Sequence, residues 1–161
     1  MSVMIKVGMA DLNIAKAPDN ITTLGLGSCV GVTLYDPKTK IGGLAHVMLP
    51  SSEEIKNNSN KAKFADTALD VLIDKMVSAG ANRRNLVAKM AGGAQMFNFN
   101  SQNDVLKIGE RNAIASKKKL KELGIRILSE DTGGNYGRTI ELNTENGDLL
   151  IKTIGHGTRV I

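Results

Sequence analysis

The stretch Thr23-Leu24-Gly25-Leu26-Gly27-Ser28-Cys29 ends in the only cysteine of a 161-residue chain. It leads into two alternating apolar runs, residues 30–35 and 41–46, which flank the sequence Asp36-Pro37-Lys38-Thr39-Lys40. Asp followed by Pro favours a tight reversal, because Pro fixes φ at the second turn position and the Asp side chain can bond the backbone ahead of it. The pattern therefore predicts a β-hairpin that brings His46 back towards Cys29.

Two registers are open for this hairpin, and both bring the thiol near the imidazole. A four-residue loop, residues 36–39, pairs Tyr35 with Lys40 and places Cys29 opposite His46. A loop one residue longer places Val30 opposite His46, with Cys29 beside it. Directly opposed residues of an antiparallel pair have Cβ atoms about 5 Å apart. Each register predicts that Cys29 and His46 form a pair.

Two glycines interrupt the apolar run that precedes the cysteine. A straight strand would separate Thr23 from Cys29 by roughly 20 Å, at about 3.3 Å per residue. Glycine accepts the positive φ of a sharp turn, so Gly25 and Gly27 allow a bend that brings Thr23 and Cys29 together. The same bend would leave backbone N–H groups around Gly27 and Ser28 free to bind an oxyanion.

Size and composition indicate one soluble globular domain covering residues 1–161. Only 3% of the residues are aromatic, so the core must consist mainly of aliphatic side chains and methionine. A formal net charge of +5 favours an acidic partner. Nucleic acid is not the expected partner, because no basic stretch is interleaved with stacking aromatic residues.

The cysteine content and the apolar pattern indicate a cytoplasmic protein. A single cysteine forms no internal disulfide, which fits a reducing compartment. No leader opens the chain and no apolar run reaches bilayer length, so we expect no integral membrane segment. No metal-ligand spacing is present, and Gly92-Gly93 and Gly133-Gly134 fit neither a Walker nor a Rossmann spacing. We expect no metal and no cofactor, and we interpret both glycine pairs as turns that line a cleft.

The remaining chain predicts two long helices and about eight strands. The helices are expected over residues 59–79 and 110–123, and each is followed by a glycine. Residues 10–20 and the segment around His156 are expected to be loops. The expected strands are residues 5–9, 21–26, 30–35, 41–46, 86–90, 125–129, 138–143 and 148–153. Helices combined with consecutive hairpins predict an α/β (α+β) fold, a layered sandwich of mixed β-sheets with two main helices.

Each candidate site residue also has an interpretation without function. A lone cysteine is more often a small buried hydrophobic residue, and a strand histidine is more often part of the core. Thr23 could serve only as a strand residue, and Thr22 competes with it for any polar role. The position of Cys29 beside the glycine bend favours catalysis, because an imidazole such as His46 can take a thiol proton and a thiolate is a strong nucleophile. A hydroxyl group can orient that imidazole.

Several motifs of the chain together resemble the CheD family of bacterial chemoreceptor glutamine deamidases. Two of them lie around the predicted hairpin, and the others follow in order along nearly the whole chain. They are residues 23–29, Gly-Gly-Leu-Ala-His-Val-Met-Leu-Pro (42–50), Lys-Phe-Ala-Asp-Thr-Ala (63–68), Ala-Gly-Gly-Ala-Gln-Met-Phe (91–97), Ile-Gly-Glu-Arg-Asn (108–112) and Glu-Asp-Thr-Gly-Gly-Asn (130–135).

The resemblance implies a catalytic triad with Cys29 as nucleophile, His46 as base and Thr23 as the residue that orients the histidine. It also implies a layered α/β fold shared with cysteine-hydrolase toxins. The implied reaction is hydrolysis of glutamine side chains to glutamate in the cytoplasmic region of methyl-accepting chemoreceptors. The family resemblance further implies receptor methylesterase activity and an interaction with a CheC-type phosphatase.

An alternative interpretation is a non-catalytic chemotaxis adaptor that binds receptors and CheC and regulates the CheC phosphatase. Phe97, Phe99 and the helix over residues 59–79 are then the surface that contacts a partner. In either interpretation Gln95, Phe97 and Phe99 are expected to lie on loops that contact the substrate or a partner. The two interpretations predict different chemistry for Cys29. A catalytic thiol should have a depressed pKa, whereas an idle thiol should behave as an unactivated or buried group.

Overall fold

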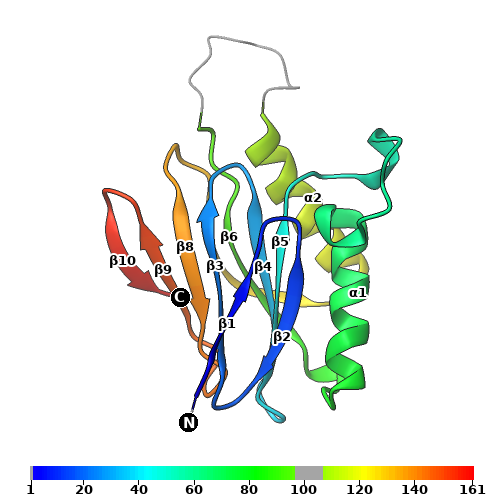
Figure 1. Ribbon diagram of the computed structural model, residues 1–161, viewed down its shortest axis with the longest axis vertical. Helices are drawn as coiled ribbons and strands as arrows, with labels where there is room; N and C mark the ends of the chain where they lie inside the picture. Colours follow the sequence, from blue (N-terminus) through cyan, green and yellow to red (C-terminus); the bar gives the residue numbers. More distant parts are fainter. Residues whose placement is uncertain (1, 97–106) are drawn as a thin grey trace.

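The computed structural model describes residues 2–96 and 107–161. Two five-stranded sheets lie face to face, and both long helices cover the outer face of one of them (Figure 1). Each sheet contains parallel and antiparallel neighbours. The predicted layered α/β sandwich of mixed sheets with two main helices is therefore confirmed. Phe97 and Phe99 lie outside the described residues.

The first sheet has the strand order β1-β3-β8-β9-β10. Its strands are β1 (Met4–Val7), β3 (Asn20–Leu26), β8 (Arg138–Leu142), β9 (Leu149–Thr153) and β10 (Gly157–Val160). The β8–β9 pair is the hairpin that the sequence predicts near the end of the chain. β3 is the central element for the candidate site, because it lies between β1 and β8 and carries Thr23.

The second sheet has the strand order β2-β5-β4-β6-β7. Its strands are β2 (Leu12–Lys16), β5 (Ile41–Val47), β4 (Val30–Asp36), β6 (Val87–Gly92) and β7 (Arg126–Thr132). All seven residues of β4 and of β5 are buried, since the helices cover one face and the first sheet covers the other. The predicted hairpin is thus the centre of this sheet.

The helices are α1 (Ala65–Ser78) and α2 (Ile108–Glu122), with short 3-10 turns η1 (Ser52–Glu54), η2 (Lys61–Lys63) and η3 (Arg83–Asn85). One core cluster fills the space between the helices and the second sheet and includes Val32, Leu69 and Leu120. A second cluster fills the space between the two sheets and includes Leu26, Cys29 and Ile140.

Three expectations about the secondary structure are wrong: two strands form where loops were expected, and one helix begins later than expected. β2 occupies part of the expected loop at residues 10–20, because its half-buried residues pair with the side of β5 that β4 leaves open. β10 likewise forms beyond His156 by pairing with β9. α1 begins at Ala65 instead of Ser59, because the extended, fully buried Phe64 forms a parallel bridge with Leu49.

The β4–β5 hairpin adopts a register that differs from both predicted ones. Gly31 pairs with His46, whereas the predictions placed Cys29 or Val30 there. Cys29 directly precedes β4 and lies two residues before Gly31. Cys29 belongs to the apolar cluster between the sheets, and His46 reaches Thr23 across the same space, so both side chains lie on the same side of the second sheet.

The local cause of the shifted register is Asp36. Its carboxylate accepts hydrogen bonds from the N–H groups of Lys38 (2.9 Å) and Thr39 (3.3 Å), so Asp36 closes the strand and caps the turn. Lys40 then takes a left-handed conformation with φ of 57° and completes the loop. The loop therefore still has four residues, 37–40, but it begins one residue later than predicted.

Candidate active site

A chain of two buried hydrogen bonds joins the sheets at His46. His46 Nδ1 lies 2.7 Å from Thr23 Oγ1, and Thr23 Oγ1 donates to the carbonyl oxygen of Val7 at 2.8 Å. A threonine hydroxyl has one proton, which this geometry directs to Val7. Thr23 must therefore accept the Nδ1–H of His46. This assignment leaves the Nε2 lone pair of neutral His46 free to take a proton.

Strand pairing explains why these three residues meet. β1 runs parallel to β3 with Val7 beside Thr23, and His46 projects from β5 of the facing sheet. Thr23 and His46 are each only 1% exposed. The neighbouring Thr22 donates its hydroxyl proton to the carbonyl of Ile140 at 2.6 Å. The competition between the two threonines is thus resolved in favour of Thr23 as the partner of His46.

His46 is a neutral base in this structure. Burial lowers its pKa, because the charged imidazolium loses hydration in the space between the sheets. Its Nε2 atom is buried and has no hydrogen-bond partner among the described residues. A buried acceptor without a partner lowers stability, so its presence calls for an explanation. Accepting a proton from a reacting group is one such explanation.

Cys29 is a buried, neutral thiol in this structure. It is 8% exposed and packs in the apolar cluster between the sheets, the same layer that receives His46. Burial raises the pKa of the thiol, and its own backbone N–H lowers it by a smaller amount. This finding contradicts the depressed pKa expected for a resting thiolate. The directions of the two pKa shifts favour the uncharged form of both members of the pair.

The three carbonyl groups of residues 27–29, the nucleophile turn, are all held from the same part of the fold. Gly27 accepts from Ala94 N–H at 2.9 Å, and Cys29 accepts from Gly93 N–H at 2.9 Å. Between them, Ser28 accepts from the side chain of Asn112 on α2 at 3.0 Å. These segments come together at one end of the molecule, where β6 ends and α2 begins (Figure 1).

The carbonyl contacts determine which way the N–H groups of the nucleophile turn point. The C=O and N–H of one peptide unit point in opposite directions, so the N–H groups of Ser28 and Cys29 face away from the loop that holds the carbonyls. Ser28 N–H has no acceptor among the described residues, and Cys29 N–H faces its own sulfur. The predicted bend before the turn is present, with φ of 69° at Gly25. The two N–H groups can therefore bind an oxyanion beside the sulfur.

Gly92 makes the close approach between β6 and the nucleophile turn possible. Its φ is 111°, and a Cβ atom there would collide with the carbonyl oxygen of Cys29. The Gly92 carbonyl accepts from Gly133 N–H at 3.0 Å and from the guanidinium of Arg138 at 3.4 Å. Arg138 is almost fully buried and forms a 3.0 Å ion pair with Asp131. This buried pair stabilises the end of β6, and the next residue, Gly93, holds the carbonyl of Cys29.

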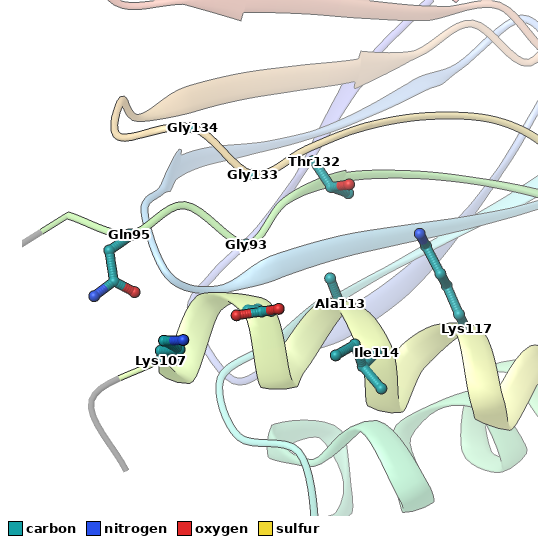
Figure 2. A pocket seen from close by; sticks show the side chains of 10 residues that line it. Gly93, Gln95, Lys107, Ala113, Ile114, Lys117, Thr132, Gly133 and Gly134 are labelled. Carbon is teal, nitrogen blue, oxygen red and sulfur yellow. The ribbon is translucent and has the colours of Figure 1, made fainter. Parts of the chain in front are cut away.

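A cavity of about 590 Å³ lies beside residues 93–95, between α2 and the two glycine loops (Figure 2). Gly93 and Gln95 line it on one side and Gly133 and Gly134 on another, so the predicted cleft lining is confirmed for these three glycines. It is wrong for Gly92, which is the last residue of β6 and does not line the cavity. Gln95 N–H donates to the carbonyl of Gly134 at 2.8 Å, which ties the two loops together. Ala113, Ile114 and Lys117 reach the cavity from α2, and Lys107 reaches it from the position just before this helix.

Two polar residues of this region, Asn112 and Arg138, had no role in the sequence-based site. A signal for Asn112 was available, since it lies in helical spacing with the buried residues Gly109, Ser116 and Leu120. Arg138 gave no such signal, because an arginine at the start of a strand is usually exposed. Its burial depends on Asp131 of β7 and on the Gly92 carbonyl of β6, and the predicted pattern of strands did not show that these strands face β8.

Further groups of the described chain complete the chemical inventory. No cluster of three or more His, Cys, Asp or Glu side chains suited to a metal occurs within residues 2–96 and 107–161. In the same ranges no helix combines the length and the apolar character needed to cross a bilayer.

Comparison with known proteins places the chain in a recognised family. A family model described as CheD chemotactic sensory transduction matches residues 48–153. A Lachnoclostridium phytofermentans protein named probable chemoreceptor glutamine deamidase CheD is 63% identical over 96% of each chain. The chemoreceptor glutamine deamidase CheD of Halalkalibacterium halodurans is 56% identical over 100% of each chain. A solved Neisseria meningitidis structure of family DUF152 is similar with a TM-score of 0.49 and 10% identity, over 83% of this chain and 64% of that one.

Proposed function

The chain belongs to the CheD family, and from this premise we propose that it hydrolyses glutamine side chains of chemoreceptors to glutamate. Relatives that are more than half identical over nearly the full chain carry the name of this activity. The observation that carries the proposal is the 2.7 Å contact between Thr23 Oγ1 and His46 Nδ1, which leaves Nε2 as a base. Cys29, on the same side of the sheet, is the nucleophile.

The first half of the reaction forms a thioester. His46 Nε2 takes the Cys29 thiol proton as the sulfur attacks the amide carbon of glutamine, so the C=O π electrons move to oxygen. The N–H groups of Ser28 and Cys29, which belong to the peptide units of the Gly27 and Ser28 carbonyls, stabilise this oxyanion. The imidazolium then protonates the nitrogen, the C–N bond breaks and ammonia leaves. Thr23 orients the imidazole throughout, by accepting its Nδ1–H.

The second half of the reaction restores the enzyme. His46 takes a proton from water as the water oxygen attacks the thioester carbon, and the same N–H groups bind the new oxyanion. The C–S bond breaks, the thiolate recovers its proton from His46, and glutamate is released. A glutamate methyl ester would follow the same path with methanol as the leaving group, so receptor methylesterase activity fits this site.

The neutral state of both groups shapes this mechanism. A raised thiol pKa and a lowered imidazole pKa disfavour a preformed ion pair. Proton transfer to His46 therefore accompanies attack on the substrate. This is general-base catalysis on a thiol, in which the base works best when it is unprotonated at neutral pH.

We also carry the family's setting over to this chain as part of the proposal. Residues 1–161 act as one deamidase domain in the cytoplasm, with the cytoplasmic region of a chemoreceptor as substrate. A CheC-type phosphatase is the expected protein partner, and the cavity rim at Gln95 is a candidate contact for either protein. Every group that the mechanism uses comes from this chain, so the proposal invokes no cofactor.

The second candidate function is the adaptor, and the burial of Cys29 favours it. An idle cysteine is expected to be buried and to have a raised pKa, and the Cys29 thiol, which is 8% exposed, has both properties. In this case binding to receptors or to CheC would be the main activity, and replacing Cys29 would leave it unchanged.

Mass spectrometry on a glutamine-bearing receptor cytoplasmic fragment separates the two functions. The fragment is incubated with the wild type, with Cys29→Ala and with His46→Gln. The deamidase predicts conversion of specific glutamines to glutamate by the wild type alone, a mass increase of about one dalton per site with release of ammonia. The adaptor predicts no conversion by any of the three proteins, with unchanged binding of the fragment. Full conversion by Cys29→Ala would contradict the proposed nucleophile.

A further inference from the structure

Asn112 is a fully buried amide in α2 that the proposed mechanism does not use. It is 0% exposed, and its Nδ2 donates to two backbone carbonyls, Ser28 at 3.0 Å and Met48 at 2.9 Å. Ser28 directly precedes Cys29 in the nucleophile turn. Met48 follows His46 by two residues and lies just beyond the end of β5. One nitrogen atom therefore joins the two segments that carry the proposed nucleophile and base.

This contact fixes a separation that the hairpin alone does not determine. Cys29 lies before the first residue of β4, so the ladder between β4 and β5 does not hold it. Gly31, which faces His46, has no side chain that could set the spacing. The two protons of one amide nitrogen leave it in fixed directions, so both accepting carbonyls are held in a defined geometry. Asn112 therefore connects the segment that carries Cys29 to the segment that carries His46.

Stability alone does not explain an asparagine at this position. Asn112 Oδ1 is buried and has no hydrogen-bond partner among the described residues. Burying an unpaired amide oxygen is unfavourable. The adjacent positions of the same helix face are occupied by the small residues Gly109, Ala113 and Ser116. The feature that an asparagine provides here, and that these residues lack, is the pair of N–H donors.

We infer that Asn112 is a positioning residue, whose amide holds the Cys29 turn at the distance from His46 that proton transfer requires. The inference rests on the proposed function for its catalytic consequence. Asn112 acts through the Ser28 and Met48 carbonyls, without contacting the substrate. Its removal reduces turnover because misplacement of a reacting group by about 1 Å can lower a rate roughly 100-fold.

The first test measures the coupling between thiol and imidazole without any receptor. The rate constant for alkylation of Cys29 by iodoacetamide is measured near pH 7 with and without His46→Gln. The ratio of the two rates gives the acceleration due to His46, and a change in thiol exposure cancels because it affects both proteins. The ratio is compared in three backgrounds: wild type, Asn112→Ala and Ser116→Ala. Ser116 is a matched control, because it is buried on the same helix face and its hydroxyl has no partner.

We expect the ratio to be roughly tenfold or more in the wild type and in Ser116→Ala, and to fall to within about twofold of one in Asn112→Ala. Asn112→Asp is the second variant, because it keeps the shape of the side chain if the alanine variant fails to fold. A carboxyl group donates at most one proton where Asn112 donates two, so the ratio falls there also. An unchanged ratio in a folded Asn112 variant overturns the inference.

The second test measures turnover of the receptor fragment. We expect kcat of the Asn112 variants to fall roughly 100-fold, with KM within about twofold of the wild type. A purely structural role would lower the melting temperature and leave kcat unchanged below it, which would overturn the inference. The two failures are distinguishable. If the alkylation ratio falls in Asn112→Ala but the wild type deamidates no glutamine, only the proposed function is contradicted. If the wild type deamidates glutamine and the alkylation ratio is unchanged in Asn112→Ala, only the role of Asn112 is contradicted.

Discussion

Replacing Thr23 by valine removes one hydroxyl group from a buried chain of hydrogen bonds and keeps the shape of the side chain. Two partners lose their bonds at once, the Val7 carbonyl at 2.8 Å and the His46 Nδ1 atom at 2.7 Å. Leaving a buried group unpaired lowers stability by about 1–3 kcal/mol, and the added methyl group offsets part of the sum. We expect the free energy of unfolding to fall by about 2–4 kcal/mol.

The effect on catalysis has a separate origin. Without its acceptor, the neutral imidazole of His46 is no longer held with its proton on Nδ1, and the tautomer with the proton on Nε2 becomes populated. That tautomer has no lone pair available to the Cys29 thiol. General-base catalysis contributes roughly 10²–10⁴-fold, so we expect kcat for deamidation to fall about 100-fold or more in Thr23→Val.

Thr22→Val is the matched control for this prediction. Thr22 is the adjacent buried threonine, and its hydroxyl donates to a single carbonyl away from the site. Urea titrations give the free energy of unfolding of both variants, and mass spectrometry of the receptor fragment gives kcat. Thr22→Val should lose about 1–3 kcal/mol of stability with kcat within about twofold of the wild type. Thr23→Ser should retain most of the turnover, because it keeps the hydroxyl.

Two results would refute this reasoning. Wild-type turnover in a folded Thr23→Val protein would show that the hydroxyl does not determine the tautomer of His46. Equal losses of kcat in Thr22→Val and Thr23→Val would show that turnover follows stability alone.

Three further variants test other parts of the structure. Because burial lowers the pKa of His46, the unfolded chain binds a proton more readily than the folded one. The free energy of unfolding therefore falls as the pH drops below about 6.5, by at most about 1.4 kcal/mol per pH unit. Urea titrations of His46→Gln should show a weaker decline with pH, and a decline equal to that of the wild type would contradict this. In Gly31→Ala the new Cβ would lie 2.5 Å from a neighbouring methyl group, so calorimetry should report a loss of about 1–3 kcal/mol, against about 0.5 or less for the open Gly8→Ala. Arg138→Met breaks a buried ion pair and should lose about 3–5 kcal/mol, whereas Arg159→Met, 61% exposed, should lose less than about 1, and similar losses would contradict the burial argument.

The sequence indicated the local elements of the site because their signals are local. The turn residues predict the hairpin, and Gly25 predicts the bend before the nucleophile turn. Both features depend on φ preferences that a single residue determines. The pairing of Thr23 with His46 was implied by the family resemblance, because the residues alone did not separate Thr23 from Thr22.

Features that depend on distant contacts could not be predicted in the same way. The register depends on whether Asp36 ends the strand or begins the loop, and its carboxylate is also held from a distant segment, by the N–H of Asn82 at 2.8 Å. The burial of Arg138 depends on Asp131 and on the Gly92 carbonyl, which come from two other strands. The raised pKa of Cys29 depends on how completely the two sheets cover it, which periodicity alone does not show.

The three held carbonyls of residues 27–29 also have a consequence for how the protein is made. Their donors, Gly93, Ala94 and Asn112, follow Cys29 in the chain by more than sixty residues. A ribosome synthesises about 5–20 residues per second, so the cysteine emerges seconds before the groups that shape its turn. A nascent or truncated chain that ends before α2 has a thiol but no assembled site. Under the proposed mechanism, reactivity towards glutamine is therefore delayed until the second half of the protein has folded.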